Sequence, residues 1–170
     1  MTISEQFRRY ALHPEPATLH PLQAAIVSAA NFDPLVLIEM TVDPLLQVGD
    51  HQGVIDALHK QMPGVFLSPT AHAFLSESHT ALGDTAAARR EEQVARLALR
   101  SITTSGTGSH GQPYRVLRVS DEYDTLRLLQ KKSTSQREVE EGNRSFDVHT
   151  TDDGTEVWFE LLWRHPEAIA

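Results

Sequence analysis

The chain has 170 residues, of which 40% are hydrophobic and 22% are charged, values typical of a folded globular protein. Its formal net charge of −8 argues against a nucleic-acid partner, because phosphates need a basic protein surface. The absence of cysteine excludes disulfides, thiolate metal ligands and cysteine nucleophiles.

The start of the chain shows no targeting signal. Arg8 and Arg9 are not followed by the apolar run of a secretory signal peptide. No stretch approaches the roughly 20 apolar residues that a membrane span needs. We therefore expect a cytoplasmic protein without a membrane partner.

Apolar residues at helical spacing predict six helices in the first 102 residues. Proline and glycine punctuation separates them, as at His13–Pro16 and Met62–Gly64. The third helix is apolar on most sides, which predicts that neighbours bury it on both sides. The expected helices are about 4–12, 20–30, 34–48, 51–62, 69–82 and 85–102.

Two Gly-Asp pairs, Gly49-Asp50 and Gly83-Asp84, lie 34 residues apart between these helices. Glycine can adopt the left-handed conformation that closes a helix, and aspartate can cap the next one. An interval of 34 residues is the period of the tetratricopeptide repeat, in which helical pairs stack into a solenoid.

Beyond residue 102 the composition changes. Residues 103–113 are rich in glycine, serine and threonine, which predicts a linker. A strand at 114–119, a short helix after Ser120 and three strands follow, and the turns 141–144 and 152–154 are of the type that joins antiparallel strands. The three later strands are about 137–141, 145–150 and 155–163.

The predicted fold class is therefore α+β. A helical, tetratricopeptide-like antiparallel front at 1–102 is followed by the linker at 103–113. A β-rich subdomain at 114–170 then forms a β-α-β-β-β antiparallel sheet.

Residues 35–102 resemble two tetratricopeptide-type helical pairs. In the second pair, Leu82 and Gly83 match the leucine-glycine pair of the repeat, and Ala95 falls at its small inter-helix position. The first pair departs from the pattern, because Gln61 stands at the small-residue position. The consensus aromatic residues are mostly absent.

A second resemblance covers more of the chain. Helical pairs, then SITTSGTGSHGQPYRVLRVSDEYDTLRLL and a terminal β segment, are similar to an uncharacterised bacterial family known only as a domain of unknown function. Asp121-Glu122-Tyr123 stands where that family has an acidic helix. The resemblance implies a fold and no activity, so no functional residue is carried over.

Three sequence features invite a chemical interpretation, and none of them predicts a cofactor. The glycines of the linker lack the Gly-Lys-Ser/Thr ending of a phosphate loop and precede a strand, whereas phosphate loops follow one. His72 and His79 are seven residues apart, too far along one helix for a shared metal ion. Asp147 and His149 alternate along one strand and so share a face opposite Phe146.

For Asp147 and His149 two interpretations stand. A carboxylate that orients an imidazole is a catalytic arrangement when a nucleophile is near. The sequence shows no nucleophile pattern, so we favour a solvated cross-strand pair.

Trp158 and Leu162 lie on the opposite face of the last strand from the expected core residues. Such a side chain needs a cover, either helices of the same chain or a second molecule. A homodimer through this back sheet is one alternative.

We expect a small, non-catalytic adaptor or assembly factor that binds a protein or peptide. Between residues 35 and 82 the only Lys or Arg is Lys60, so the helical surface is acidic and favours a basic partner. The alternatives are a hydrolase-type enzyme with a site between the two halves and a toxin-neutralising partner protein. The predicted interaction surface consists of Glu39, Asp43, Asp56, Glu77, Trp158 and Leu162.

Overall fold

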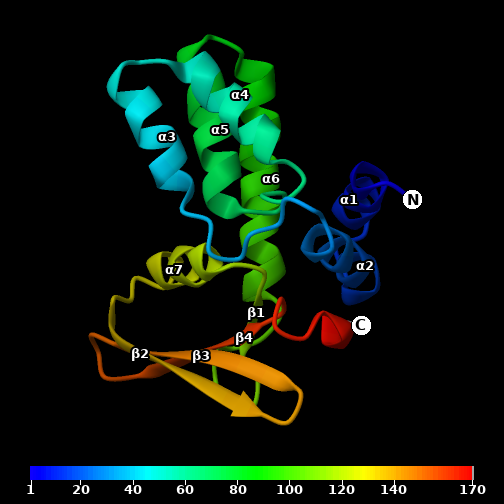
Figure 1. Ribbon diagram of the computed structural model, residues 1–170, viewed down its shortest axis with the longest axis vertical. Coiled ribbons are helices and arrows are strands. Elements are labelled where there is room, and N and C mark those ends of the chain that lie inside the picture. Colours follow the sequence, from blue (N-terminus) through cyan, green and yellow to red (C-terminus); the bar gives the residue numbers. More distant parts are fainter. Residues whose placement is uncertain (170) are drawn as a thin grey trace.

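The computed structural model describes residues 1–169 and has an α+β architecture (Figure 1). All six predicted helices are present in the first 103 residues, although the second starts earlier and the third later than predicted. They are α1 (Ile3–Leu12), α2 (Pro16–Val27), α3 (Ile38–Gln47), α4 (His51–Gln61), α5 (Pro69–Ala81) and α6 (Thr85–Thr103). No helix in the described part of the chain is both long and apolar enough to cross a membrane.

The two Gly-Asp pairs form the same helix junction. Gly49 and Gly83 have positive φ angles of 71° and 81°. The N–H of Asp84 donates to the carbonyl of His79, and that of Gly83 to Thr80, which is the Schellman arrangement. Asp50 and Asp84 then cap α4 and α6 by accepting backbone N–H groups at 2.9 Å. This local prediction is confirmed, whereas identity with the tetratricopeptide repeat stays a prediction.

We expect Gly83→Val to lower the free energy of unfolding by about 1 kcal/mol or more. A Cβ at Gly83 meets no atom within 4 Å, so the cost comes from the backbone conformation and not from a clash. Urea unfolding of this variant and of Gly111→Val, at an exposed glycine without positive φ, measures the difference. Equal stability of the two variants would contradict the assignment.

The third helix differs from its prediction. Within α3 only Ile38 and Val42 are buried, while Met40 is 74% exposed. The physical reason is position, because α3 lies at the outer edge of the row of upright helices and packs mainly on α4 (Figure 1). The apolar residues before it, including Leu35 and Leu37, also remain exposed.

The back of the chain is a four-stranded sheet with one helix. Its elements are β1 (Tyr114–Val116), α7 (Val119–Leu128), β2 (Ser133–Glu141), β3 (Arg144–Thr151) and β4 (Glu156–Leu161), and a short 3-10 helix η1 (Pro166–Ile169) follows. The strand order is β1-β4-β3-β2.

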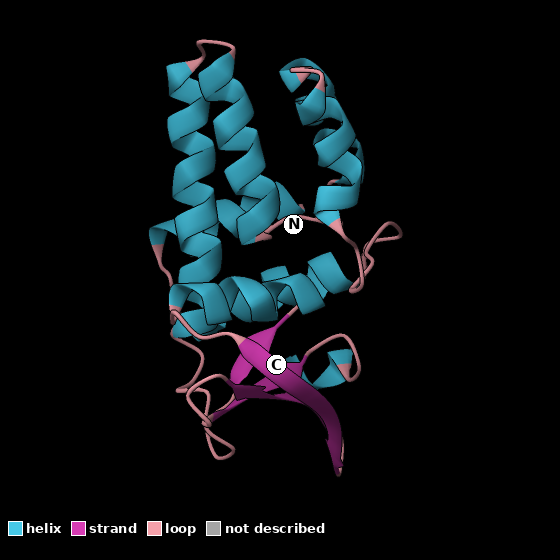
Figure 2. Cartoon of the chain, turned by 90° about the vertical axis from the view of Figure 1, so that its left-hand side faces the viewer, coloured by secondary structure: helices cyan, strands magenta, loops and turns pink. Residues whose placement is uncertain are grey.

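The sheet is mixed and not wholly antiparallel as predicted. β1 pairs with β4 in parallel, while β2, β3 and β4 pair by antiparallel hairpins. Because α7 carries the chain back across the sheet after β1, that strand can lie parallel to β4. The helix itself lies between the upright helices and the sheet, as two views show (Figures 1 and 2).

One hydrophobic core joins the front and back of the chain. It contains Tyr10 from α1, Leu22 from α2, Leu117 after β1 and Ile169 from η1. Leu162 belongs to the same core and is 1% exposed. The predicted boundary between a helical region and a β-rich subdomain therefore crosses a shared core.

The predicted linker has regular contacts with its surroundings. α6 extends through Thr103, and the N–H groups of Thr107 and Gly108 both donate to the carbonyl of Gln112. The N–H of Trp158 donates to the carbonyl of Gly108 at 2.8 Å, so the loop is attached to β4. This segment folds against the sheet.

Candidate functional site

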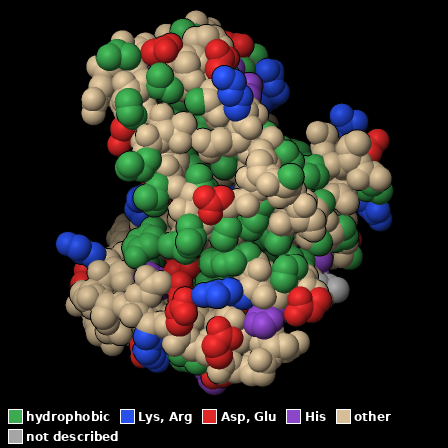
Figure 3. Space-filling model, in the orientation of Figure 1, with side chains coloured by type: hydrophobic (Ala, Val, Ile, Leu, Met, Phe, Trp, Pro, Cys, Tyr) green, Lys and Arg blue, Asp and Glu red, His purple; other side chains and the backbone are tan. Residues whose placement is uncertain are grey.

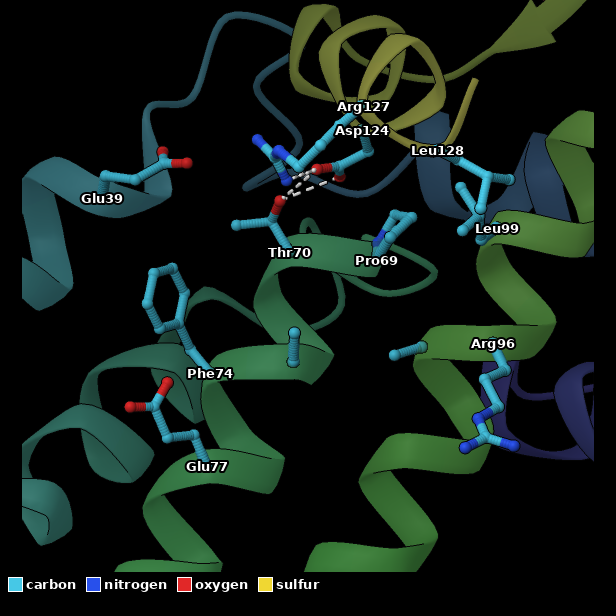
Figure 4. A pocket seen from close by; sticks show the side chains of 12 residues that line it. Glu39, Pro69, Thr70, Phe74, Glu77, Arg96, Leu99, Asp124, Arg127 and Leu128 are labelled. Carbon is cyan, nitrogen blue, oxygen red and sulfur yellow. Dashed lines mark hydrogen bonds and ion pairs between the residues drawn. The ribbon is translucent and has the colours of Figure 1, made fainter. Parts of the chain in front are cut away.

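An apolar groove of about 540 Å³ lies where α3, α5, α6 and α7 meet. Its floor carries the small residues Ala73 and Ala95 beside Phe74 and Leu99, and Leu128 closes the end at α7 (Figure 4). Leu128 is 53% exposed, so its side chain is accessible at this end of the groove. Hydrophobic side chains also gather on the visible face between the upper helices and the sheet region (Figure 3).

The end of the groove near α7 is polar and ordered. The hydroxyl of Thr70 donates to both carboxylate oxygens of Asp124, at 2.7 and 2.8 Å, across 54 residues of sequence. Arg127 pairs with the same carboxylate at 3.1 Å (Figure 4). Burial raises the pKa of Asp124, while Thr70 and Arg127 oppose that shift. These contacts hold α7 against the first turn of α5.

The unpaired charge of the groove is negative. Both cations in its lining have partners, because Arg127 pairs with Asp124 and Arg96 pairs with Glu92 at 2.6 Å. Glu39 and Glu77 also line the groove and form no ion pair among the described residues. A bound molecule would therefore meet apolar walls and two free carboxylates.

The residues of the predicted interaction surface do not all lie together in the structure. Glu39 and Glu77 come together in the groove. Asp43 and Asp56 are exposed on α3 and α4 but do not line it, and Asp56 accepts a hydrogen bond from Gln52 at 2.9 Å. Leu162 is buried in the shared core, so it cannot contact a partner.

Trp158 is half-buried and covered by its own chain. Its ring lies 4.4 Å from that of His110 in the 103–113 loop and 5.7 Å from that of Phe146. The guanidinium of Arg137 lies 5.7 Å from the indole. The cover is thus this loop and an arginine of the same chain. It does not consist of helices, which we had considered as the cover within the chain.

The sequence did not point to Thr70, Asp124, Arg127 or Leu128 as site residues. Their signal is weak, because each is an ordinary residue of an amphipathic helix when considered alone. An apolar Leu128 beside the charged Arg127 was the one visible hint of an exposed apolar surface. Only the packing of α7 on α5 brings them together.

The second candidate pair, Asp147 and His149, belongs to a buried polar network beneath α7. The cross-strand register puts both on the face opposite Phe146 and Val148, as predicted. The prediction of a solvated pair is wrong, because Asp147 is 3% exposed and His149 is fully buried. The reason is Glu122 of α7, which covers this face and lies 2.7 Å from His149 Nε2.

One arrangement of protons satisfies these contacts. Ser133 Oγ lies 2.8 Å from His149 Nδ1, and Gln136 donates to Asp147 Oδ2 at 2.7 Å. The two remaining oxygens, Glu122 Oε1 and Asp147 Oδ1, have no other partner, and the interaction of the two acids raises the pKa of Glu122. A proton on Glu122 Oε1 that points at Asp147 leaves Oε2 free to accept from His149 Nε2–H. The ring can then accept the hydroxyl proton of Ser133.

The pKa shifts agree with this arrangement. Burial, together with the nearby charge of Asp147, raises the pKa of Glu122 to about 10. Burial also raises the pKa of Asp147 and lowers the pKa of His149. At neutral pH, Glu122 is therefore protonated and His149 is neutral.

The serine, histidine and glutamate of this network have the contacts of a nucleophile, its base and an orienting acid. They do not line the groove. The arrangement holds α7 on the sheet.

No group of three or more His, Asp or Glu side chains in residues 1–169 has a geometry that could hold a metal ion. Comparison with models of known families, with curated proteins and with solved structures finds no match to this chain. The groove and the network therefore rest on the geometry of this chain alone.

Proposed function

We propose that this protein binds a peptide segment of a partner protein in the groove between α3, α5, α6 and α7. The observation that carries the proposal is the combination of an open apolar floor with two free glutamates. Soluble proteins rarely leave large apolar side chains together on the surface without a partner. The volume of about 540 Å³ has room for a few side chains of such a segment.

The chemistry of the partner follows from the lining. Phe74, Leu99 and Leu128 favour large apolar side chains that fit over the small Ala73 and Ala95. Glu39 and Glu77 favour a lysine or arginine at the edge of the segment. The proposed occupant is therefore a short segment with apolar residues beside at least one basic residue, in a role as adaptor or assembly factor.

Selection of a displayed library of short peptides at low salt tests the proposal. We expect enrichment of Lys or Arg next to large apolar residues. Binding of the enriched peptide, measured by fluorescence polarisation, should weaken at least about tenfold in Ala73→Trp, because the indole fills the groove. Ala81→Trp is the matched control, at an exposed alanine of the same helix outside the lining.

Charge reversal separates the electrostatic part of recognition. Glu77→Lys should weaken binding of the enriched peptide and reduce the salt dependence of that binding. Asp56→Lys makes the same charge change outside the groove and should have a smaller effect. If Ala73→Trp binds the peptide as well as the unaltered protein does, the groove is not the peptide site.

A further inference from the structure

A second cavity, of about 360 Å³, lies on another part of the molecule, between α1, α2, the end of α6 and β1. Nine polar residues contribute to its walls. They are Tyr10, Glu15, His20, Gln23, Arg100, Ser101, Thr104, Ser105 and Arg115. This volume is within the range of small-molecule sites, and the groove lining shares none of these residues.

Two polar side chains of this cavity are buried without partners. Gln23 is 3% exposed, and its amide oxygen Oε1 is buried without a hydrogen-bond partner within residues 1–169. Tyr10 is 2% exposed, and the hydrogen bonds of the described chain include none from its hydroxyl. A buried amide or hydroxyl without a partner costs free energy, so such groups usually face water or a ligand.

His20 adds a third donor. The guanidinium of Arg115 always carries its protons, so its Nη1 donates to His20 Nε2 at 3.1 Å. Burial first, and the charge of Arg115 second, lower the pKa of His20. The ring is therefore neutral at pH 7 with its proton on Nδ1, which can donate to a ligand.

Arg100 supplies the available positive charge. Arg115 is already paired with Glu160 at 3.3 Å and donates to the carbonyl of Ala168. Arg100 forms no ion pair among the described residues, and its charge acts on the hydroxyl of Tyr10. The acid of the lining, Glu15, lies at the exposed rim.

We propose that this cavity binds the carboxylate or phosphate group of a small molecule. Arg100 supplies the opposite charge, and Tyr10, His20 and Gln23 supply neutral donors. Acceptor oxygens can pair with the guanidinium, the hydroxyl, the imidazole N–H and the amide NH2 at once, while Gln23 Oε1 is left for a hydroxyl or N–H group of the same ligand. The site is separate from the peptide groove, so the protein would bind two different ligands.

NMR spectroscopy of the ¹⁵N-labelled full chain tests the proposal, with inorganic phosphate and acetate titrated separately at constant ionic strength. At least one anion should cause saturable chemical-shift changes at the backbone amides of Gln23 and Ser101. The anion that binds more tightly shows whether the cavity prefers a phosphate or a carboxylate group. Arg100→Gln should weaken that binding about tenfold or more, since a hydrogen bond to a charged group is lost. Arg89→Gln, an exposed arginine of the same helix, should leave it unchanged.

Gln23→Leu gives an independent readout. Removing a buried amide without a partner should preserve the fold or stabilise it, while the affinity for the anion falls. Ala73→Trp, which fills the peptide groove, should not alter anion binding, so the two proposals fail separately. Non-saturable shifts with both anions up to tens of millimolar, or equal losses in Arg89→Gln and Arg100→Gln, would overturn the proposal.

Discussion

Glu122→Gln should fold and be at least as stable as the unaltered protein at pH 7, while Glu122→Ala should be less stable than Glu122→Gln by about 3 kcal/mol or more. The amide can donate to Asp147 and accept from His149, so it reproduces both contacts of the protonated acid. Alanine leaves a cavity and two buried polar groups without partners. Urea unfolding of the three proteins measures the difference.

The unaltered protein and Glu122→Gln should differ in how strongly their stability depends on pH. The folded pKa of Glu122 is raised from 4.5 to about 10, so its contribution to stability is complete below pH 4.5 and is lost as pH rises towards 10. Between pH 7 and 9 His149 stays neutral, because its pKa is lowered. The free energy of unfolding should fall with pH, by at most about 1.4 kcal/mol per unit, for one released proton.

Glu122→Gln removes that titrating proton, so its stability should depend less on pH over this interval. The glutamine variant should consequently be the more stable protein at pH 9. Identical slopes for Glu122→Gln and the unaltered protein would show that Glu122 is ionised in the folded state. A loss of several kcal/mol in Glu122→Gln at pH 7 would contradict the proton arrangement.

Arg118→Leu should lower the free energy of unfolding by roughly 3–5 kcal/mol. Arg118 is fully buried at the start of α7, and its Nη2 donates to the carbonyls of Gly64 at 2.6 Å and Phe66 at 2.7 Å. It also lies 3.8 Å from Asp121, the nearest buried carboxylate. Leucine leaves that acid without its cation and both carbonyls without a donor.

Two controls separate these causes. Arg127→Leu removes an arginine of the same helix that is 72% exposed, and should cost less than about 1 kcal/mol.

Burial raises the pKa of Asp121 to about 6 while Arg118 lowers it, so Arg118→Leu should raise the pKa of Asp121 further. Because a raised pKa removes stability as pH rises, the loss in Arg118→Leu should be smaller at pH 5 than at pH 7. A loss that is equal at both pH values would show that Arg118 does not interact with Asp121.

Features that depend on neighbouring residues were predictable. The Gly83-Asp84 junction needs only a glycine with positive φ and an aspartate that caps the next helix, and both are visible in the sequence. The shared face of Asp147 and His149 follows from the alternation of a strand.

Features that depend on distant packing were not predictable. The apolar pattern of α3 suggested burial, but the sequence of a single helix does not show how many neighbouring helices pack against it. His149 is buried because Glu122, 27 residues earlier, is placed over it. The groove likewise needs Thr70 and Asp124 to meet across 54 residues.

The core shared by both ends of the chain limits how this protein can be divided or recombined. A helical array that is self-contained can be cut out and transplanted as a module. Here Leu22 and Ile26 of α2 pack in one cluster with Leu162 and Ile169, which come from the far end of the sequence. An isolated front would expose that apolar surface to water, so we expect the helical region and the sheet to unfold together.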